Sequence, residues 1–519
     1  MNKQDTIPSL PGFGPVAQPE RIEILDILRG FALLCILIVN WSGDLPWDVD
    51  YWEGFRGTAD NIAYRTVEFL LNEKSRPMFA FMFGLGFAIQ MQRAESRDGR
   101  FIIVYSRRLV ILFLIGAVHF IFTERDILFQ YALFGFLLFP LRKLNLRLLI
   151  VLSLICITGV FIYDSVKVYN NHKRIAKINS ARTEISVDST LLDSYVGVYE
   201  IPERTFFVMR DKNDLFVQPN GLRPLRLVAE STTKFSLKRN ANNKLSFLKD
   251  SIGTVNSLTT SAGDLYRKIQ SGQPVIDDAT LRQAAKKDKS YRTYATGSFG
   301  EIVSMRAKEF WNKISSWTSY INWLKDPFSV FLLGLYAGRK RIFHSISNNR
   351  KFIRKIMWWG LIFGLGAQAV NLVWELWLRD DNNFRFWPEA FLRLISLLGC
   401  PALALGYLAG LTLLLQRVVG KKIFAPLASV GQMALTNYLL QSVVFVLLFF
   451  GYGLGWFGKV GPFVGLLLAL LLFALQIVFS RWWLRHFRFG PFEWLWRSLT
   501  YWKFQPMSLK KEKKEILSS

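Results

Sequence analysis

The sequence predicts an all-α polytopic membrane bundle of about ten transmembrane helices, with an extracytoplasmic β-rich domain inserted into it. Apolar runs long enough to cross a bilayer recur in both halves of the 519-residue chain, of which 51% is hydrophobic. Basic residues concentrate in the short loops between alternate runs, which is the pattern of cytoplasmic loops. Residues 166–318 have no long apolar run and show short strand patterns instead.

The net charge indicates the class of partner, and the cysteine positions indicate packing roles. A formal net charge of +26 would suggest nucleic acid in a soluble protein. Here the basic residues lie between apolar runs, so we expect the lipid bilayer, and no nucleic acid, as the partner. The first 20 residues are polar and rich in Pro and Gly, so we expect no cleavable signal peptide. The three cysteines lie in apolar runs without a Cys-x-x-Cys spacing, so we predict packing roles and no metal site.

Apolar runs and charges together divide the chain into five parts. These are a disordered cytoplasmic arm at 1–20, membrane helices one to five at 21–165, an extracytoplasmic insert at 166–318, membrane helices six to ten at 319–486, and a cytoplasmic C-terminal motif with a basic tail at 487–519. Charge alternation places both termini inside and the insert outside the plasma (inner) membrane of a bacterium.

The expected spans follow the apolar runs, with one amphipathic segment left over. Residues 60–72 are amphipathic, so we expect them to lie at the outer interface rather than to cross. The spans are expected at about 21–43, 76–92, 104–122, 127–141, 146–165, 319–338, 355–377, 390–415, 424–450 and 462–484.

The insert contains a predicted β-rich core at about 191–270. Its strand signals are TFFVMR, LFVQP, LRLVAE, KFSLKR, KLSFLKD and SIGTVNSLTT, separated by turn signals such as DKND and NANN. Phe235 with Leu237, and Leu245 with Phe247, show the alternation of half-buried strands. We therefore expect a small antiparallel barrel or sandwich, followed by helical segments near 278–288 and 299–318 that return to the membrane.

A helical hairpin at residues 105–143 lies at the centre of the predicted bundle. His119, the only one of four histidines within an apolar run, and Asp126, seven residues on, flank its short turn. An ionisable group at membrane depth is costly, so we expect a catalytic role, with His119 as general base and Asp126 orienting its ring. The structural alternative is that His119 hydrogen-bonds a helix backbone and Asp126 caps the second helix.

Several arginines near the cytoplasmic side are candidate anion ligands. Arg29 is three residues from Asp26 and shares its helix face. It either forms a local ion pair there or faces an inner cavity, where it would bind phosphates with Arg107 or Arg108. Arg497, one turn from Glu493, allows the same two interpretations.

Polar residues inside or at the outer ends of the spans are candidates for a substrate path. Asn437 and Gln441 lie one turn apart in the ninth span, and they either join helices by hydrogen bonds or line such a path. Glu375 lies near an outer end, where it either contacts an acceptor or belongs to a solvated rim.

The chain resembles the family called domain of unknown function 418, the YeiB-like membrane proteins. The segments that carry the resemblance are LDILRGFALLCILIVN (25–40), SRPMFAFMFGLGFAIQMQRA (75–94), YSRRLVILFLIGAVHFIFTERDILFQYALFGFLL (105–138), ASVGQMALTNYLLQS (428–442) and FGPFEWLWRSLT (489–500). That family is similar to transmembrane acyltransferases, including those that acetylate cell-surface sugars. The resemblance implies acyl-CoA as cytoplasmic co-substrate, a cell-envelope glycan as acceptor, and a histidine on the outer side in transfer.

The insert resembles the small β-barrel that is appended to some serine β-lactamase-like peptidases. The matching residues are LLDSYVGVYEI (191–201) and DLFVQPNG (214–221). The resemblance brings no catalytic residue, so we interpret the insert as a binding or packing module.

Two further functions remain open from the sequence. One is a transporter or channel for a small polar solute, whose helices would be broken near mid-membrane, as Gly84, Gly86 and Pro401 allow. A third possibility is a sensor or scaffold that displays the β-rich insert.

Overall fold

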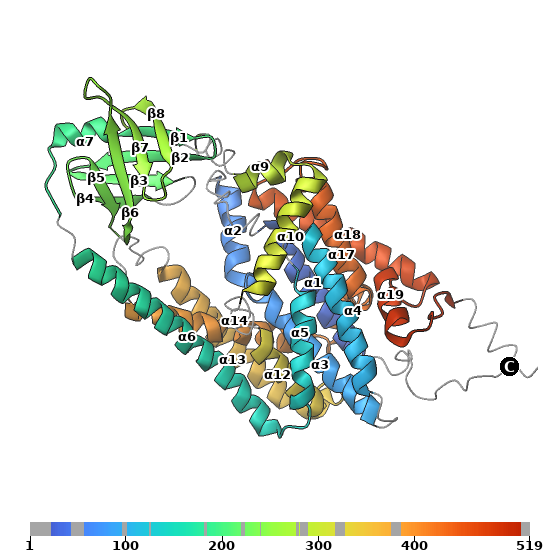
Figure 1. Cartoon of the computed structure of the whole chain (residues 1–519). Helices are drawn as coiled ribbons and strands as arrows, with labels where there is room; N and C mark the ends of the chain where they lie inside the picture. Colours follow the sequence, from blue (N-terminus) through green and yellow to red (C-terminus); the bar gives the residue numbers. More distant parts are fainter. Residues whose placement is uncertain are drawn as a thin grey trace, which may run out of the picture.

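The computed structural model describes residues 22–42, 57–95, 101–123, 126–180, 184–219, 224–238, 240–276, 280, 289–316, 327–374 and 386–509. A helical bundle forms the larger part, and a separate β-barrel stands beside one end of it, next to helix α6 (Leu146–Ser180) (Figure 1). The predicted arm at 1–20 lies outside the described residues.

Most of the chain is helical. The other bundle helices are α1 (Glu23–Ser42), α2 (Thr58–Leu70), α3 (Ser75–Glu95), α4 (Phe101–Phe122), α5 (Leu128–Leu141), α12 (Pro327–Arg339), α13 (Ile346–Val373), α14 (Phe386–Leu414), α15 (Val418–Phe424), α16 (Pro426–Gln432), α17 (Ala434–Phe449), α18 (Pro462–His486) and α19 (Pro491–Tyr501).

Several of these helices suit a membrane. In the described part of the chain, α1, α4, α6, α13, α14 and α18 are long and apolar enough to cross a bilayer. Helices α16 and α17 meet at a bend of 86° and would add a seventh span if the pair is one span. Helices α5 and α12 are apolar but shorter. The fold is thus that of a multi-pass membrane protein, and the count of about ten spans stays a prediction.

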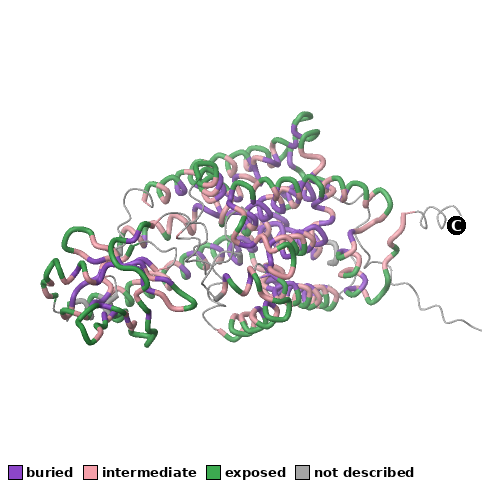
Figure 2. The backbone as a smooth tube through the Cα atoms, turned by 90° about the horizontal axis from the view of Figure 1, so that it is seen from above, coloured by how far each residue is buried: buried purple, intermediate pink, exposed green. Residues whose placement is uncertain are grey.

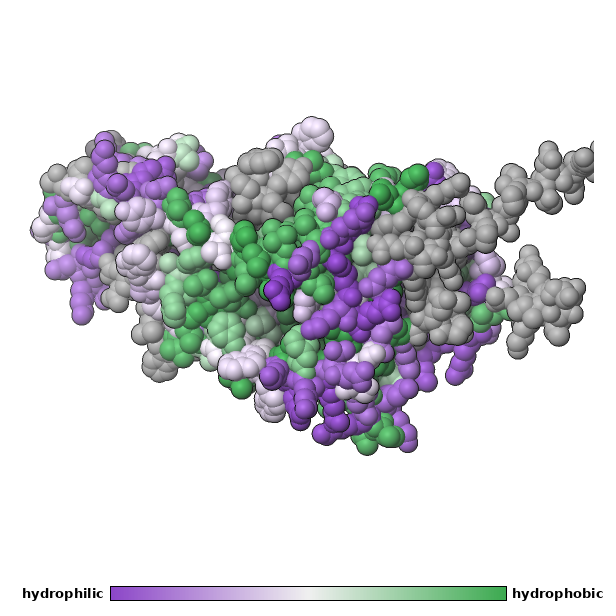
Figure 3. Space-filling model, turned by 90° about the horizontal axis from the view of Figure 1, so that it is seen from below, coloured by the Kyte–Doolittle hydropathy of each residue, from purple (hydrophilic) through white to green (hydrophobic). Residues whose placement is uncertain are grey.

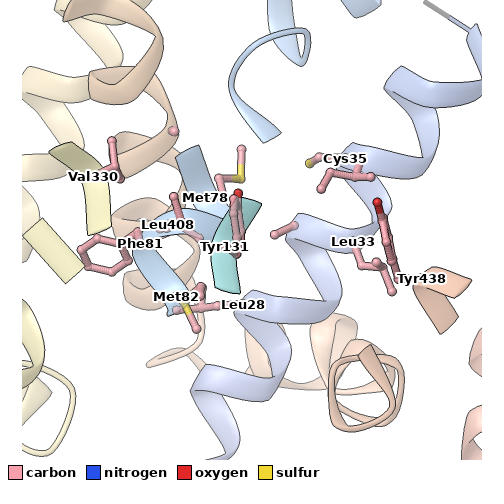
Figure 4. Packing of buried hydrophobic residues seen from close by; sticks show 14 of the residues in the cluster. Leu28, Leu33, Cys35, Met78, Phe81, Met82, Tyr131, Val330, Leu408 and Tyr438 are labelled. Carbon is pink, nitrogen blue, oxygen red and sulfur yellow. The ribbon is translucent and has the colours of Figure 1, made fainter. Parts of the chain in front are cut away.

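Buried apolar side chains fill the middle of the bundle (Figure 2). Figure 4 shows Leu28 and Leu33 of α1 packing near Met82 of α3 and Tyr438 of α17. On the face shown in Figure 3, apolar side chains gather over the part of the helical region next to the barrel, polar ones form a band over the rest of that region, and polar ones cover much of the barrel. The helical surface therefore resembles a lipid-facing surface more than the barrel surface does.

Small residues let neighbouring helices approach closely. A Cβ atom on Gly431 of α16 would lie only 1.9 Å from the carbonyl oxygen of Asp26 in α1. A Cβ atom on Gly360 of α13 would lie 2.5 Å from the carbonyl oxygen of Ala402 in α14. Because lipid gives no hydrophobic drive for helix association, such close packing is a main source of stability in membrane bundles.

Helix α6 is longer than the fifth span that the sequence predicts. It runs unbroken for 35 residues, past the expected end at residue 165. At 1.5 Å per residue it extends on the order of 50 Å, well beyond a hydrocarbon core of about 30 Å. The predicted start of the insert at residue 166 therefore lies within this helix, which leads the chain out to the barrel (Figure 1).

The insert folds as a closed antiparallel barrel in which each strand pairs with the next and β1 pairs with β8. A short helix, α7 (Ser189–Tyr195), precedes it. The strands are β1 (Gly197–Ile201), β2 (Arg204–Asp211), β3 (Asp214–Pro219), β4 (Leu225–Ala229), β5 (Lys234–Leu237), β6 (Asn240–Lys249), β7 (Val255–Thr260) and β8 (Leu265–Ser271). The six strand signals in the sequence correspond to β2–β7, whereas β1 and β8, which close the barrel, had no separate signal.

The barrel has a core of its own. Phe235, Leu245 and Phe247 are buried in it, and Leu237 packs against it, as the alternation predicts. The ring of Tyr195 from α7 stacks on Phe247 with 4.3 Å between the centroids. The core residues of the bundle form a different cluster, so the barrel is a separate packing unit.

Two helices connect the barrel back to the bundle. They are α9 (Lys289–Thr296) and α10 (Phe299–Ser315). The first begins later than the segment expected near 278–288, most of which lies outside the described residues. Tyr291 and Tyr294 of α9 belong to the bundle core, so α9 packs with the bundle rather than with the barrel.

Candidate functional site

The hairpin of α4 and α5 brings His119 and Asp126 together. Nδ1 of His119 lies 2.6 Å from Oδ2 of Asp126. The other carboxylate oxygen accepts a hydrogen bond from the backbone N–H of Phe129 at 2.9 Å, in the first turn of α5. Asp126 therefore makes both contacts that the sequence leaves as alternatives, since it holds the imidazole and also caps the helix.

The pair is buried within the protein rather than facing lipid. His119 is 6% exposed and Asp126 is 4% exposed. An ionised carboxylate at Nδ1 makes that nitrogen the donor and leaves Nε2 as the acceptor. The hydroxyl of Thr123 lies 3.5 Å from Nε2, which is too far for a strong hydrogen bond. The arrangement leaves Nε2 able to accept a proton.

Two aromatic side chains, Tyr438 and Phe310, lie at this end of the hairpin. The ring of Tyr438 in α17 lies 5.0 Å from the His119 ring, centroid to centroid. Phe310 of α10 lies 5.3 Å from Phe120 and 5.6 Å from Phe129, the neighbours of the pair in α4 and α5. The helix that returns from the insert therefore covers this end of the hairpin.

Arg108 and Arg29 form a basic cluster elsewhere in the bundle. The guanidinium of Arg108 lies 3.9 Å from the centroid of the Trp496 ring in α19, and the indole N–H of Trp496 donates to the carbonyl of Arg108 at 2.9 Å. The charge of Arg29 lies within electrostatic range of Arg108 and acts unfavourably on it. Arg29 also pairs with Asp26 at 3.0 Å, as one of the two sequence interpretations predicts.

Arg108 and His119 share one face of α4. They are eleven residues apart, which is about three helical turns and on the order of 16 Å along the axis. Arg107, one position earlier, is exposed and points away from this face.

The ninth predicted span is broken, and a distant glutamate holds the break. The sequence predicts one helix over about 424–450, but α16 and α17 meet at Met433 with a bend of 86°. Glu493 of α19 accepts hydrogen bonds from the backbone N–H groups of Leu435 and Thr436, at 2.6 and 3.1 Å. Burial raises the pKa of this carboxyl, although its hydrogen bonds oppose the rise.

Asn437 and Gln441 are turned toward α18, not toward His119. The side-chain amide of Asn437 donates to the hydroxyl of Ser480 at 2.9 Å. The amide of Gln441 donates to Gln476 at 2.8 Å, and Gln476 donates to the carbonyl of Asn437 at 2.9 Å. These contacts match the helix-joining interpretation.

The remaining predicted residues lie apart from the pair. Arg497 stacks its guanidinium 4.5 Å from the centroid of Phe489, one turn from Glu493. Glu375 lies outside the described residues. The structure therefore joins His119 to Asp126 and Arg29 to Asp26, and it directs the side chains of Asn437 and Gln441 to α18.

Three residues of the site were not predicted as such by the sequence. Tyr438 and Trp496 were not singled out, and Glu493 was considered only as a neighbour of Arg497. Each contacts a residue that is distant in the sequence: the separations are 319 positions for Tyr438, 388 for Trp496 and 58 for Glu493. The only available signal was that Tyr438 and Trp496 lie inside the segments 428–442 and 489–500 that resemble the family.

Known proteins show similarity over most of the chain. Residues 337–503 match the family described as "Protein of unknown function (DUF418)". "Uncharacterized protein YxaH" of Bacillus subtilis (strain 168) is 28% identical over 509 residues, which cover 96% of this chain and 98% of that protein. The "Uncharacterized 39.9 kDa protein in amylase 3'region" of Bacillus acidopullulyticus is 24% identical over 506 residues, covering 96% and 99%.

A third relative covers a shorter part. "Uncharacterized protein YeiB" of Escherichia coli (strain K12) is 37% identical over 136 residues, which are 26% of this chain and 34% of that protein. The matched family segment contains Tyr438, Glu493 and Trp496, the three side chains that α17 and α19 bring to α4. These matches confirm the resemblance of this multi-pass membrane protein to the DUF418, YeiB-like family, with residues 337–503 as the segment that the family describes.

Proposed function

We propose that the protein transfers an acyl group from a cytoplasmic acyl-CoA to an acceptor outside the membrane, such as a cell-envelope glycan. The observation that carries the proposal is the buried contact between His119 and Asp126. A histidine whose Nδ1 is held by a carboxylate presents Nε2 as a general base.

In the proposed reaction, a hydroxyl oxygen of the acceptor attacks the carbonyl carbon of the thioester. Nε2 of His119 takes the proton of the hydroxyl as the new C–O bond forms. The C–S bond then breaks, and the proton passes from His119 to the departing sulfur, so that CoA leaves as a thiol. Asp126 stabilises the imidazolium between these two proton transfers.

The basic cluster of Arg29 and Arg108 is the proposed site for the phosphates of CoA. Two neighbouring guanidinium groups favour a ligand of high negative charge, and arginine suits bidentate contacts with phosphate. Because Arg108 and His119 share a face of α4, an extended pantetheine arm lying along that face would carry the thioester toward Nε2.

The test uses the full-length protein in lipid nanodiscs, with radiolabelled acetyl-CoA and longer acyl-CoAs as probes. Wild type is expected to bind an acyl-CoA, and Arg108→Ala is expected to weaken binding about tenfold or more, since a hydrogen-bonded charge is removed. Arg107→Ala, on the exposed face, should weaken binding less than Arg108→Ala does. Equal effects of the two substitutions, or no binding by wild type, would contradict the proposal.

A transporter for a small polar solute is the second candidate. The specific observation in its favour is the 86° break between α16 and α17, because transporters commonly use discontinuous helices near their substrate sites. The two candidates differ in one measurement. A transporter in proteoliposomes would move a solute without acyl-CoA and would retain that flux in His119→Gln, whereas the acyltransferase would form an acylated product that the same substitution abolishes.

A further inference from the structure

We infer that Glu493 is a positioning residue, which sets the ring of Tyr438 against His119 by capping the broken helix α17 from α19. Helix α17 begins at Ala434 after Met433, and no side chain at its own N-cap supplies a hydrogen bond. The first N–H groups of a helix have no partner within it, so a buried helix start needs an acceptor from elsewhere. Glu493 supplies this acceptor from 57 and 58 positions away along the chain.

The cap is reciprocal, which fixes the two helix starts to each other. One oxygen of Glu493 accepts from the backbone N–H groups of Leu435 and Thr436. The hydroxyl of Thr436 donates to the other oxygen and accepts from the backbone N–H of Phe492 at 3.1 Å. Each helix therefore supplies a hydrogen-bond partner to the first turn of the other.

The cap lies close to the residue of α17 that contacts His119. Tyr438 is only two residues beyond Thr436, about 3 Å further along the same helix. A shift of the first turn of α17 would therefore move the Tyr438 ring directly. Glu493 is 9% exposed, so its place cannot be taken freely by solvent.

Helix α19 contacts both α17 and α4, at two points one turn apart. Glu493 holds the start of α17, and Trp496 holds the carbonyl and the guanidinium of Arg108 in α4. The C-terminal helix thus connects the helix that carries Tyr438 with the helix that carries His119 and Arg108. The role in catalysis rests on the proposed acyl transfer, whereas the geometric role does not.

The experiment follows the imidazole of His119 by NMR in nanodiscs, without any acyl-CoA, in protein labelled with ¹³C and ¹⁵N at histidine. The chain has four histidines, so single substitutions assign every ring signal. Glu493→Ala is expected to shift the His119 ring signals and to leave those of His172, His344 and His486 in place. Asp188→Ala is the matched control, because Asp188 caps helix α7 beside the barrel through the N–H of Thr190 and does not touch α17.

Kinetics then separate the two proposals. If wild type transfers acyl groups, Glu493→Ala should lower kcat on the order of tenfold to a hundredfold while KM for acyl-CoA stays within about twofold, since only the positioning of the reacting groups changes. Failure of wild type to transfer any acyl group would end the proposed function but leave the NMR result standing.

Unchanged His119 signals in a folded Glu493→Ala protein would overturn the inference about Glu493. If that variant does not fold, Glu493→Asp replaces it, because it keeps the carboxylate but shortens its reach to the backbone N–H groups of Leu435 and Thr436. A shift of the His119 signals in Glu493→Asp supports the inference, and identical signals contradict it.

Discussion

At the scale of single residues, Asp126 has two roles that substitution can separate. Its Oδ2 atom contacts Nδ1 of His119, and its Oδ1 atom accepts from the N–H of Phe129. Asn at this position retains an oxygen for the helix cap but presents an amide or an uncharged oxygen to the imidazole. It therefore cannot stabilise the imidazolium that the proposed reaction forms.

We predict that Asp126→Asn lowers acyl transfer by a factor on the order of 10² or more, while the melting temperature changes little. Asp126→Ala should in addition lose about 1 kcal/mol of stability with the helix cap. Transfer assays and thermal unfolding of both variants in detergent check this. Full activity in Asp126→Asn would show that the carboxylate serves only as a cap.

The raised pKa of Glu493 gives a pH dependence with a definite sign. The folded protein holds this proton more tightly than the unfolded chain, whose carboxyl titrates near 4.5. The free energy of unfolding should therefore fall as the pH rises from 4.5 through the folded pKa, and stay constant above it. Glu493→Gln cannot ionise, so its melting temperature should fall less over this window. If the melting temperatures of wild type and Glu493→Gln changed in parallel with pH, Glu493 would be excluded as the source of the pH dependence.

At the scale of elements, the close contact between α1 and α16 depends on glycine. We predict that Gly431→Ala separates these helices, because its Cβ would lie 1.9 Å from the carbonyl oxygen of Asp26. The expected loss of stability is about 1–3 kcal/mol, seen as a lower melting temperature.

The matched control for this contact is Gly366→Ala in α13, where a Cβ meets no described atom within 4 Å. Alanine there should be neutral or stabilising by up to about 1 kcal/mol, since glycine is a poor helix former. If both substitutions had the same effect, the cost at Gly431 would come from helix propensity and not from packing.

At the scale of the whole molecule, the barrel and the basic loops should lie on opposite sides of the membrane. We predict that a cysteine at Ser251, in the exposed turn between β6 and β7, reacts with an impermeant maleimide in intact cells. A cysteine at Lys422, exposed in α15, should react only after the membrane is opened. Both belong in a background without Cys35, Cys156 and Cys400. The reverse pattern of labelling would show that the barrel lies on the cytoplasmic side.

Local patterns in the sequence predicted some features and missed others for physical reasons. The alternation at Phe235 and Phe247 predicted the barrel, because period 2 reports burial directly. The short loop after His119 allowed a contact with Asp126, which the sequence left as one of two alternatives, because a hairpin restricts where the chain can go. The break at Met433 was missed, because its hydrogen-bond partner Glu493 is supplied by a different helix. The length of α6 was missed because its C-terminal part is polar and has no apolar run that would predict a helix.

The central claim is that the imidazole of His119 is the base in acyl transfer, and one measurement tests it most directly. Purified wild type and His119→Gln in nanodiscs receive radiolabelled acyl-CoA and a panel of hydroxyl-bearing sugar acceptors, and both bound acyl-CoA and acylated product are counted. The account predicts that both proteins bind acyl-CoA and that only wild type forms product. Product formed at the same rate by His119→Gln would contradict it.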